Sequence, residues 1–366
     1  MASATHTFGI LTSGGDCPGL NAAIRGVAKA AHEKYSMNII GINEGFRGLI
    51  EGDVKLLKST DVSGILTRGG TILGTSREKP FKNDETGSLR DSEAGRNKPE
   101  AIIENYKNLN LDCLVILGGN GTHKTANLLK KAGLNIVGLP KTIDNDIWGT
   151  DVTFGFHSAV DIATGAIDRL HSTAHSHNRV MVVELMGHKA GWLSLYAGIS
   201  GGGDVILIPE IPYSIDCICR HLLKRASQGK AFSIVVVAEG AVSVEEAMLP
   251  KAERKKLKKT NEYFTKGYEI AQAIQQTAGM ETRLTVLGYQ QRGGTPSPYD
   301  RLLATMFGTA AAELLHNGDY GKIVALEGTR VVARPLEEIA GKLKLVPIDH
   351  PLIETARGVG TCFGDA

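Results

Sequence analysis

The chain has 366 residues, which is enough for two α/β lobes with ordinary cores. Its 41 lysines and arginines nearly balance its 39 aspartates and glutamates, so the charge does not require a nucleic-acid partner. No window approaches the roughly 20 apolar residues of a membrane span, and residues 1–7 lack the pattern of a signal peptide. Five scattered cysteines, without zinc-site spacing, are expected to be free thiols. We therefore expect a cytoplasmic protein that binds neither nucleic acid nor membrane.

Apolar runs of strand length alternate with glycine turns and helical patterns. The first run, 8–12, enters a Ser-Gly-Gly-Asp turn, then a helical pattern from about Leu20 to Lys34 and a second run at 38–42. Strand, turn, helix, strand is typical of a parallel sheet, and continuous Val, Ile and Leu runs indicate strands covered on both faces. We therefore predict an α/β fold of mainly parallel sheets flanked by helices. Later copies comprise the run 111–117, the turn 118–122, a helix to about Lys131, the run 135–139, and runs beginning at 180–185 and 233–238.

Two polar stretches interrupt this pattern. Residues 77–99 are charged and are expected to form a surface excursion. The basic run 251–259 is expected to be a solvated helix or loop, with an anion or partner site as the alternative.

Glycine turns that follow predicted strands are the first candidates for a binding site. In parallel α/β sheets ligands bind at the carboxyl ends of the strands, where backbone NH groups of glycines and a helix N-terminus attract phosphate. Most Gly-Gly turns are nevertheless explained by tight packing between strand and helix. Neither Gly14-Gly15 nor Gly118-Gly119 belongs to a GxxxxGKS or GxGxxG string, which argues against a P-loop or a dinucleotide-binding fold.

The segment 140–146, Pro-Lys-Thr-Ile-Asp-Asn-Asp, is more specific. It follows a predicted strand and carries two carboxylates, Asp144 and Asp146, together with Lys141 and Thr142. Phosphoryl transfer to an alcohol needs a carboxylate that accepts the hydroxyl proton and groups that hold metal and neutralise charge. An Asx turn that closes a loop is the alternative explanation.

Three arginines lie beside predicted strand ends. Arg179 precedes the run that begins at 180, and Arg283 and Arg292 flank a run at 284–288. Because arginine binds phosphate through two parallel hydrogen bonds, these side chains are candidate phosphate ligands, with surface ion pairs as the alternative.

Several long strings now occur in one order along the chain. The first is Leu-Thr-Ser-Gly-Gly-Asp-Cys-Pro-Gly-Leu-Asn-Ala-Ala-Ile-Arg at 11–25. The others are at 68–77, 118–122, 140–146, 186–187, 238–240, 281–294 and 298–301. In content and order, from about residue 8 to 330, this chain resembles the phosphofructokinase family. The resemblance implies a 6-phosphofructokinase of glycolysis, which transfers the γ-phosphoryl group of ATP to the 1-hydroxyl of fructose 6-phosphate and gives fructose 1,6-bisphosphate.

The resemblance also implies roles for individual residues. Asp144 matches the base for the sugar hydroxyl, and Thr142 and Asp146 complete the predicted catalytic set. Asn120 and Asp146 match positions near Mg²⁺. Residues matching the donor site are Gly15, Arg77, Gly118, Gly119, Asn120, Gly121, Thr122 and Lys141. Residues matching the fructose 6-phosphate site are Thr142, Asp144, Arg179, Met186, Gly187, Glu239, Arg283, Tyr289 and Arg292.

Three positions depart from the family pattern. Asn120 replaces the usual metal-binding aspartate of the GGDG motif and adds no charge. His188 replaces an arginine after Met-Gly, and Tyr289 replaces a histidine at the sugar phosphate. These departures motivate one remote alternative, a non-catalytic sugar-phosphate or nucleotide sensor, which the retained Asp144 and Asp146 disfavour.

The phosphoryl donor depends on two further positions. Pyrophosphate users of the family carry an aspartate where this chain has Gly121, and they carry a lysine where this chain has Lys141. This glycine and lysine combination resembles a mixed group in which ATP use occurs. We expect ATP because the missing side chain leaves room for the nucleotide, with pyrophosphate-dependent phosphotransfer as the alternative.

The family also implies an architecture. We expect a donor lobe of residues 1–155 plus 291–341 and a fructose 6-phosphate lobe of residues 156–290 plus 342–366. We further expect a homodimer or homotetramer, because some of the family's active-site arginines reach across a subunit interface.

Overall fold

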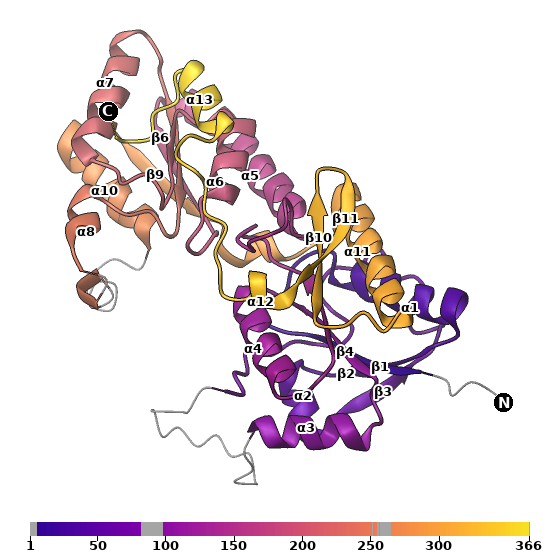
Figure 1. Cartoon of the computed structure of the whole chain (residues 1–366). Helices are drawn as coiled ribbons and strands as arrows, with labels where there is room; N and C mark the ends of the chain where they lie inside the picture. Colours follow the sequence, from indigo (N-terminus) through magenta and orange to yellow (C-terminus); the bar gives the residue numbers. More distant parts are fainter. Residues whose placement is uncertain (1–5, 82–97, 251, 255, 257–264, 366) are drawn as a thin grey trace, which may run out of the picture. The chain divides into compact units, whose positions relative to one another are not determined.

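The computed structural model describes residues 6–81, 98–250, 252–254, 256 and 265–365. The chain forms two compact units, shown in Figure 1. The first comprises Met1–Thr142, Ile147–Ser158 and Arg292–Leu343; the second comprises Ile143–Asp146, Ala159–Gln291 and Lys344–Ala366. Most of the predicted polar excursion and of the basic run 251–259 lies outside the described residues.

The first unit is built on a seven-stranded sheet with the order β11-β10-β5-β4-β1-β2-β3. Its interior strands are parallel, whereas β3 pairs antiparallel with β2 at one edge and β11 pairs antiparallel with β10 at the other. The strands are β1 (Thr7–Thr12), β2 (Asn38–Ile42), β3 (Val54–Leu57), β4 (Cys113–Gly118), β5 (Ile136–Pro140), β10 (Lys322–Glu327) and β11 (Arg330–Pro335).

The register aligns the carboxyl ends of the central strands. Thr12 of β1 pairs with Leu117 of β4, and Gly118 pairs with Pro140 of β5. The segments that follow these three strands therefore leave the same edge of the sheet. These segments are the two glycine turns and the Lys-Thr-Ile-Asp-Asn-Asp string.

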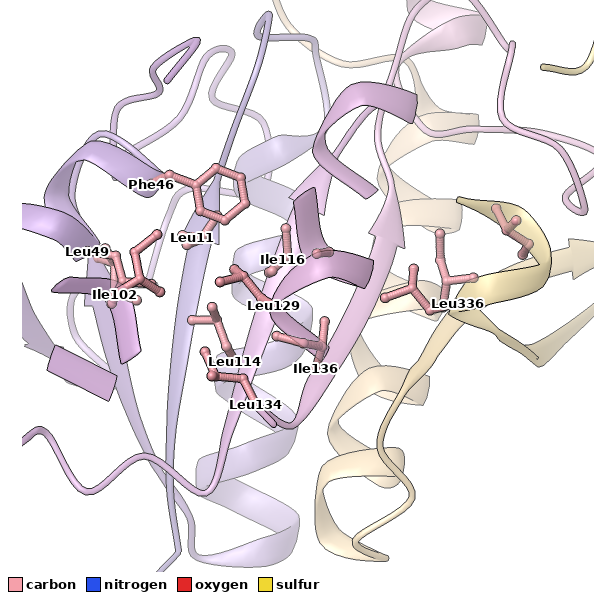
Figure 2. Close-up of a cluster of buried hydrophobic side chains, with 14 of the residues drawn as sticks. Leu11, Phe46, Leu49, Ile102, Leu114, Ile116, Leu129, Leu134, Ile136 and Leu336 are labelled. Atoms are coloured by element: carbon pink, nitrogen blue, oxygen red, sulfur yellow. The ribbon is translucent and has the colours of Figure 1, made fainter. Parts of the chain in front are cut away.

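Helices cover both faces of this sheet, as the continuous apolar runs predict. Figure 2 shows one core cluster, to which β4 contributes alternate side chains and β1 and β5 contribute one side chain each, with residues of α2, α3, α4 and α12 packed against them. The remaining residues of β4 are buried as well, so its other face is also covered. The helices of this unit are α1 (Leu20–Tyr35), α2 (Phe46–Glu51), α3 (Lys98–Asn108), α4 (Asn120–Lys131), α11 (Pro298–His316) and α12 (Leu336–Ile339).

Helices α1 and α11 pack closely against each other at a pair of glycines. A Cβ on Gly308 would lie 2.7 Å from the carbonyl oxygen of Ala23, and one on Gly26 would lie 3.1 Å from that of Thr305. The two backbones approach this closely because neither position carries a side chain.

The second unit has a four-stranded, wholly parallel sheet with the order β7-β8-β6-β9. Its strands are β6 (Val180–Leu185), β7 (Val205–Leu207), β8 (Ser233–Ala238) and β9 (Thr282–Val286). Every residue of β6, β7 and β8 is buried. The remaining elements are α5 (Phe156–His177), α6 (Trp192–Ser200), α7 (Ile215–Ser227), α8 (Val244–Met248), α10 (Lys266–Ala278), the 3₁₀ turn η1 (Gly288–Arg292) and α13 (Pro351–Gly358).

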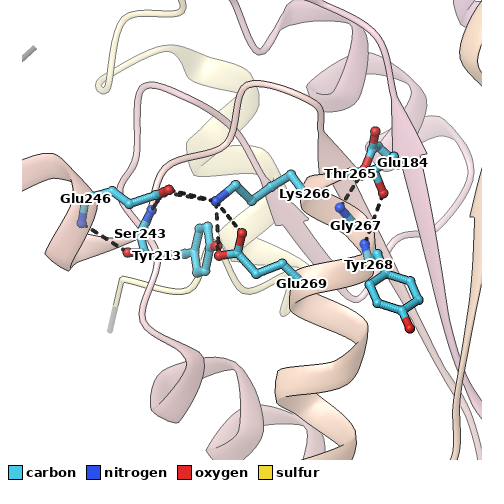
Figure 3. Close-up of polar contacts among 9 residues, drawn as sticks. All are labelled: Glu184, Tyr213, Ser243, Glu246, Thr265, Lys266, Gly267, Tyr268 and Glu269. Atoms are coloured by element: carbon cyan, nitrogen blue, oxygen red, sulfur yellow. Dashed lines mark hydrogen bonds and ion pairs between the residues drawn. The ribbon is translucent and has the colours of Figure 1, made fainter. Parts of the chain in front are cut away.

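A polar network around the buried Lys266 fixes the start of α10 (Figure 3). The ammonium group of Lys266 lies 3.0 Å from a carboxylate oxygen of Glu246 in α8 and 2.9 Å from one of Glu269, and its side chain is only 6% exposed. The backbone NH of Gly267 donates to the Glu184 carboxylate of β6, and Thr265 caps the helix through the NH of Tyr268. These contacts tie α10 to both α8 and the sheet.

All five cysteines are free, in agreement with the expectation from their spacing. Among the described residues, no helix has the length and apolar character needed to cross a membrane.

Candidate active site

The first glycine turn follows β1 and is held by backbone hydrogen bonds from two sides. The NH of Ser13 donates to Leu117 at 3.0 Å, and the NH of Gly14 donates to Ser76 at 2.9 Å. Gly14 has a φ of +86°, in the left-handed region that favours glycine. The bond to Ser76 places Arg77, which is exposed, one residue from this turn.

Two cationic side chains bind the carbonyl groups of this turn. Lys141, which is 3% exposed, donates from its ammonium group to the carbonyl of Gly15. Arg292 donates to the carbonyl of Asp16 at 3.0 Å, and its Nη1 would lie 2.5 Å from a Cβ on Gly15. Gly15 is therefore needed for the close approach of the guanidinium group. The structure thus brings Gly15, Lys141 and Arg292 together.

Cys17, just beyond this turn, is not a reactive thiol. Its sulfur is buried and lies 3.6 Å from the carbonyl oxygen of Phe154. Burial raises the pKa of Cys17 to about 12, although Lys141 acts in the opposite direction. The thiol therefore stays protonated at neutral pH and serves as packing.

The second glycine turn joins β4 to α4 and leaves a helix N-terminus without acidic residues in its first turn. A Cβ on Gly118 would lie 2.3 Å from Thr122, so the strand and the helix meet only because this position is glycine. The Thr122 hydroxyl donates to the carbonyl of Ser13 at 3.4 Å and joins the two glycine turns. Gly121 faces open space, since a Cβ there would have no described atom within 4 Å. The first NH groups of a helix have no partner within the helix, and together with the helix dipole they attract an anion.

Asn120 makes contacts that the sequence did not indicate. Its amide oxygen accepts a hydrogen bond from the NH of Gly341, and its amide nitrogen donates to the carbonyl of Lys342, both at 3.0 Å. The side chain therefore holds the segment that follows α12. Its predicted role as a metal ligand stays a prediction.

The string after β5 spans the boundary between the two units. Within the first unit, Lys141 and Thr142 are buried, and the carbonyl of Thr142 accepts a hydrogen bond from the hydroxyl of Thr153 at 2.7 Å. Residues 143–146 belong to the second unit. There Asp146 is 6% exposed, whereas Asp144 is half-buried.

Asn145, between the two aspartates, adopts an unusual backbone conformation. Its φ is +52°, in the left-handed region, and only 2% of the residue is exposed. Asparagine tolerates this conformation better than most residues with a Cβ, but non-glycine residues adopt it rarely. The turn therefore has a defined shape that other parts of the second unit must support.

Three predicted sugar-site residues lie at the carboxyl ends of β6 and β8, which pair side by side. Arg179 and Arg283 lie instead at the amino ends of β6 and β9, at the opposite edge of this sheet. Met186 and Gly187 follow β6, and Glu239 follows β8. The NH of Glu239 donates to the carbonyl of Leu185 at 2.8 Å, and the NH of His188 donates to the Glu239 carboxylate at 2.8 Å. His188 has a φ of +52°, and its contact with Glu239 is made by its backbone NH.

The predicted phosphate ligands Arg179 and Arg283 share one carboxylate. Both guanidinium groups contact Oε1 of Glu281, at 2.9 and 2.5 Å. The hydrogen bond from Arg179 is the main cause of a lowered Glu281 pKa. Arg283 lies within β9, not before a strand, and Tyr289 in η1 is 74% exposed. Neither the ion pairs of Glu281 nor the hydrogen bonds of Asn120 could be predicted from neighbouring residues in the sequence.

Comparison with known proteins now identifies the class. The family model for phosphofructokinase matches residues 7–315, and this chain belongs to the phosphofructokinase family. The recognition from the sequence motifs and the predicted α/β fold are thus confirmed.

Full-length relatives carry a more particular name. An ATP-dependent 6-phosphofructokinase of Spirochaeta thermophila is 75% identical over 99% of this chain and 98% of its own length. ATP-dependent 6-phosphofructokinase 3 of Bacteroides thetaiotaomicron is 55% identical over 98% and 99%, respectively.

Solved structures agree on the fold. A phosphofructokinase from Saccharomyces cerevisiae is 30% identical with a TM-score of 0.77, and the match covers 91% of this chain but 45% of the yeast chain. A pyrophosphate-dependent phosphofructokinase from Marinobacter aquaeolei has a TM-score of 0.76 over 94% of this chain and 86% of its own. At 22% identity, this second structure shows the shared fold alone.

Proposed function

We propose that this chain is a 6-phosphofructokinase that transfers the γ-phosphoryl group of ATP to the 1-hydroxyl of fructose 6-phosphate in glycolysis. The observation that carries this proposal is the end-to-end 75% identity with a protein named ATP-dependent 6-phosphofructokinase. The open space at Gly121 agrees with a nucleotide donor, since it leaves room where pyrophosphate users of the family have an aspartate.

Asp144 is proposed to accept the proton of the 1-hydroxyl as that oxygen attacks the transferred phosphorus. Its half-buried carboxylate suits this role, because it is held on a defined turn and retains access to a substrate. Met186, Gly187 and Glu239 are proposed to orient the sugar. Arg292 is proposed to bind the 6-phosphate together with Arg179 and Arg283 from a neighbouring subunit. Within one chain these two arginines lie at the edge of the sheet opposite to Met186, Gly187 and Glu239.

The donor phosphates are proposed to bind at the two glycine turns. Lys141 supplies positive charge beside Gly15, and Arg77 follows the strand-like bridge at Ser76. The N-terminus of α4, with open space at Gly121, offers backbone NH groups to the same phosphates. These groups neutralise charge that develops on the transferred phosphoryl group.

The residues fit Mg²⁺ in the manner usual for this ion, which keeps several waters and binds one or two carboxylates together with substrate phosphates. Within the described residues, no cluster of three or more His, Cys, Asp and Glu side chains could hold a metal, so a cage made by protein alone is not expected. Asp146 is proposed as the carboxylate ligand and Asn120 as a neutral oxygen ligand. When bound, Mg²⁺ lowers the charge of the phosphates that the hydroxyl attacks.

Pyrophosphate is the alternative donor, and Lys141 is the residue that favours it. The test is one coupled assay of the purified chain that compares ATP with pyrophosphate at the same fructose 6-phosphate concentration. We expect a higher kcat/KM with ATP. A preference for pyrophosphate would replace ATP as the proposed donor, and turnover with neither would support the sensor interpretation. We also propose a cytoplasmic homodimer or homotetramer.

A further inference from the structure

The segment 344–346 supports the turn that carries the two aspartates, from a position about 200 residues later in the chain. The ammonium group of Lys344 donates to the amide oxygen of Asn145 at 2.9 Å, and its backbone NH donates to the carbonyl of Asp146 at 2.9 Å. One residue thus contacts two consecutive residues of the turn, one through its side chain and one through its backbone.

Lys344 is itself held from a second direction. The indole NH of Trp192, the first residue of α6, donates to the carbonyl of Lys344 at 2.9 Å. The ammonium group lies 5.4 Å from the centre of the same indole ring, a distance at which a cation is attracted to the ring face. Trp192 is 7% exposed, so it forms a rigid support for the lysine.

A half-buried carboxylate fixes the segment two residues further on. Glu210 accepts hydrogen bonds from the NH of Val346 at 2.9 Å and from the NH of Gly191, directly before α6, at 3.0 Å. A Cβ on Gly191 would lie 2.7 Å from this carboxylate, so the close approach depends on glycine. Lys344 is therefore attached to a frame made by α6 and Glu210 rather than to a loose chain end.

The contact with Asn145 matters because this residue sets the direction of its neighbours. In its left-handed conformation, Asn145 turns the chain between Asp144 and Asp146. A change of this conformation would move both carboxylates, and misplacement of a reacting group by about 1 Å can cost up to 10²-fold in rate. An ammonium group bound to the Asn145 amide oxygen opposes such a change.

We propose that Lys344 is a positioning residue for this turn: through Asn145 it holds the carboxylates of Asp144 and Asp146 in the orientation that phosphoryl transfer requires. This inference rests on the proposed function of the two aspartates. A merely structural role for Lys344, as an anchor of the last 20 or so residues, would instead change stability and leave turnover of the folded enzyme intact.

The first experiment separates these roles by steady-state kinetics of the full chain. Lys344→Met keeps an apolar stem against Trp192 but removes the charge, and it should lower kcat about tenfold while the KM for fructose 6-phosphate stays within about threefold. Lys344→Arg, which keeps a donor and a cation, should recover most of the turnover. Lys342→Met is the matched control, because this exposed lysine lies two residues earlier in the same segment, and it should retain wild-type kinetics.

The second experiment tests whether the effect passes through Asn145. Asn145→Gly removes the amide but permits the left-handed conformation. If Lys344 acts through Asn145, Lys344→Met should lower kcat in the wild-type background and have little further effect in the Asn145→Gly background. Should Lys344→Met fail to fold, Lys344→Gln serves in both experiments.

Three results would overturn the proposal: wild-type kcat in Lys344→Met, a loss entirely in KM, or losses that multiply in the double variant. Thermal unfolding of each variant is measured alongside, and a lower Tm with unchanged kcat supports the anchor role instead. Asp144→Asn is assayed in parallel. If that variant keeps full turnover, the proposed function of the aspartate is wrong, whereas the coupling between Lys344 and Asn145 can still be read from the double variant.

Discussion

The open space at Gly121 makes the donor preference testable at a single residue. In Gly121→Asp, a carboxylate at the start of α4 would meet the α-phosphate of a nucleotide, and steric exclusion and charge repulsion act in the same direction. We expect the kcat/KM for ATP to fall by at least about tenfold, which corresponds to about 1.4 kcal/mol. Any activity with pyrophosphate, which has no α-phosphate, should fall much less.

The control for this change is Gly121→Ala. A methyl group in open space adds little bulk and no charge, so the ratio of the two donor efficiencies should stay at the wild-type value. If Gly121→Asp leaves that ratio unchanged, the bound nucleotide does not lie next to residue 121.

A second prediction at this scale concerns the proposed base. Asp144→Asn keeps the shape of the side chain but cannot accept the hydroxyl proton, so kcat should fall by roughly 10²–10⁴-fold, with a much smaller change in KM. Asp161→Asn, at an exposed aspartate of α5, should leave kcat unchanged. Near-normal turnover in Asp144→Asn would remove this residue from the mechanism.

Residue identities could be predicted only where the signal is local. The string 140–146 can be recognised as a candidate site because it has two carboxylates and an amide at three consecutive positions after a strand. The hydrogen bonds of Asn120 to Gly341 and Lys342, and that of Lys344 to Asn145, join residues about 200 positions apart. No spacing rule relates such pairs, because the fold alone brings them together.

Among the helices, α4 carries a buried histidine that makes stability depend on pH. His123 is fully buried against Gly138 of β5, and burial lowers its pKa to about 4, although nearby backbone groups of Gly118 and Leu139 act in the opposite direction. An unfolded histidine titrates near 6.5, so below that pH the unfolded state takes up the proton first. The contribution of the neutral His123 to the free energy of unfolding is therefore complete above about pH 6.5 and decreases as the pH falls towards 4.

The expected difference is measured by chemical unfolding at pH 7 and pH 5. Between these values the wild type should lose about 2 kcal/mol more stability than His123→Leu, because the variant has no group to protonate at this position. Because each protein is compared with itself at the two pH values, any effect of the substitution on packing that does not depend on pH cancels. Parallel stability curves would show that the imidazole titrates alike in the folded and unfolded states.

The start of α10 offers a prediction about a buried ion pair. Lys266→Met leaves the half-buried carboxylates of Glu246 and Glu269 without their shared cation. The cost should lie between the about 0–1 kcal/mol of an exposed pair and the about 3–5 kcal/mol of a fully buried one. Lys322→Met is the control, because its partner Asp319 is 42% exposed and an exposed pair contributes about 0–1 kcal/mol. Equal losses in the two variants would show that solvent screens the Lys266 network as well.

At the scale of elements, the repeated strand, turn and helix pattern was predictable, and the edges were not. The apolar runs at 38–42, 180–185 and 233–238 coincide with β2, β6 and β8. Most residues of the antiparallel edge strands β3 and β11 are exposed or half-buried, and these strands lack the continuous apolar run of a buried strand. The burial of Lys266 in the α10 network likewise cannot be predicted from the spacing of apolar residues, because a lysine is buried only where other elements supply partners for its charge.

For the whole molecule, the two arginines at Glu281 bear on the proposed oligomer. Arg179 and Arg283 come from segments about 100 residues apart and converge on one carboxylate. A cluster with a partly exposed guanidinium group can exchange that carboxylate for a phosphate. The family resemblance implies that some such arginines serve the active site of a neighbouring subunit, and we propose the same here.

Complementation between two inactive variants tests this sharing. Asp144→Asn lacks the proposed base, and Arg283→Ala lacks a proposed phosphate ligand, so each homo-oligomer should be nearly inactive. If one active site takes Asp144 from one subunit and Arg283 from its partner, every mixed pair contains one intact site. Half of the pairs are mixed when equal amounts assemble at random, and one of the two sites in each mixed pair is intact, so co-expression should restore about one quarter of the wild-type activity.

Asp144→Asn co-expressed with Asp146→Asn is the control: both aspartates lie on one turn, so no intact site can form and no activity should return. Recovery in neither mixture would place Arg283 in the same subunit's site and contradict the shared arrangement.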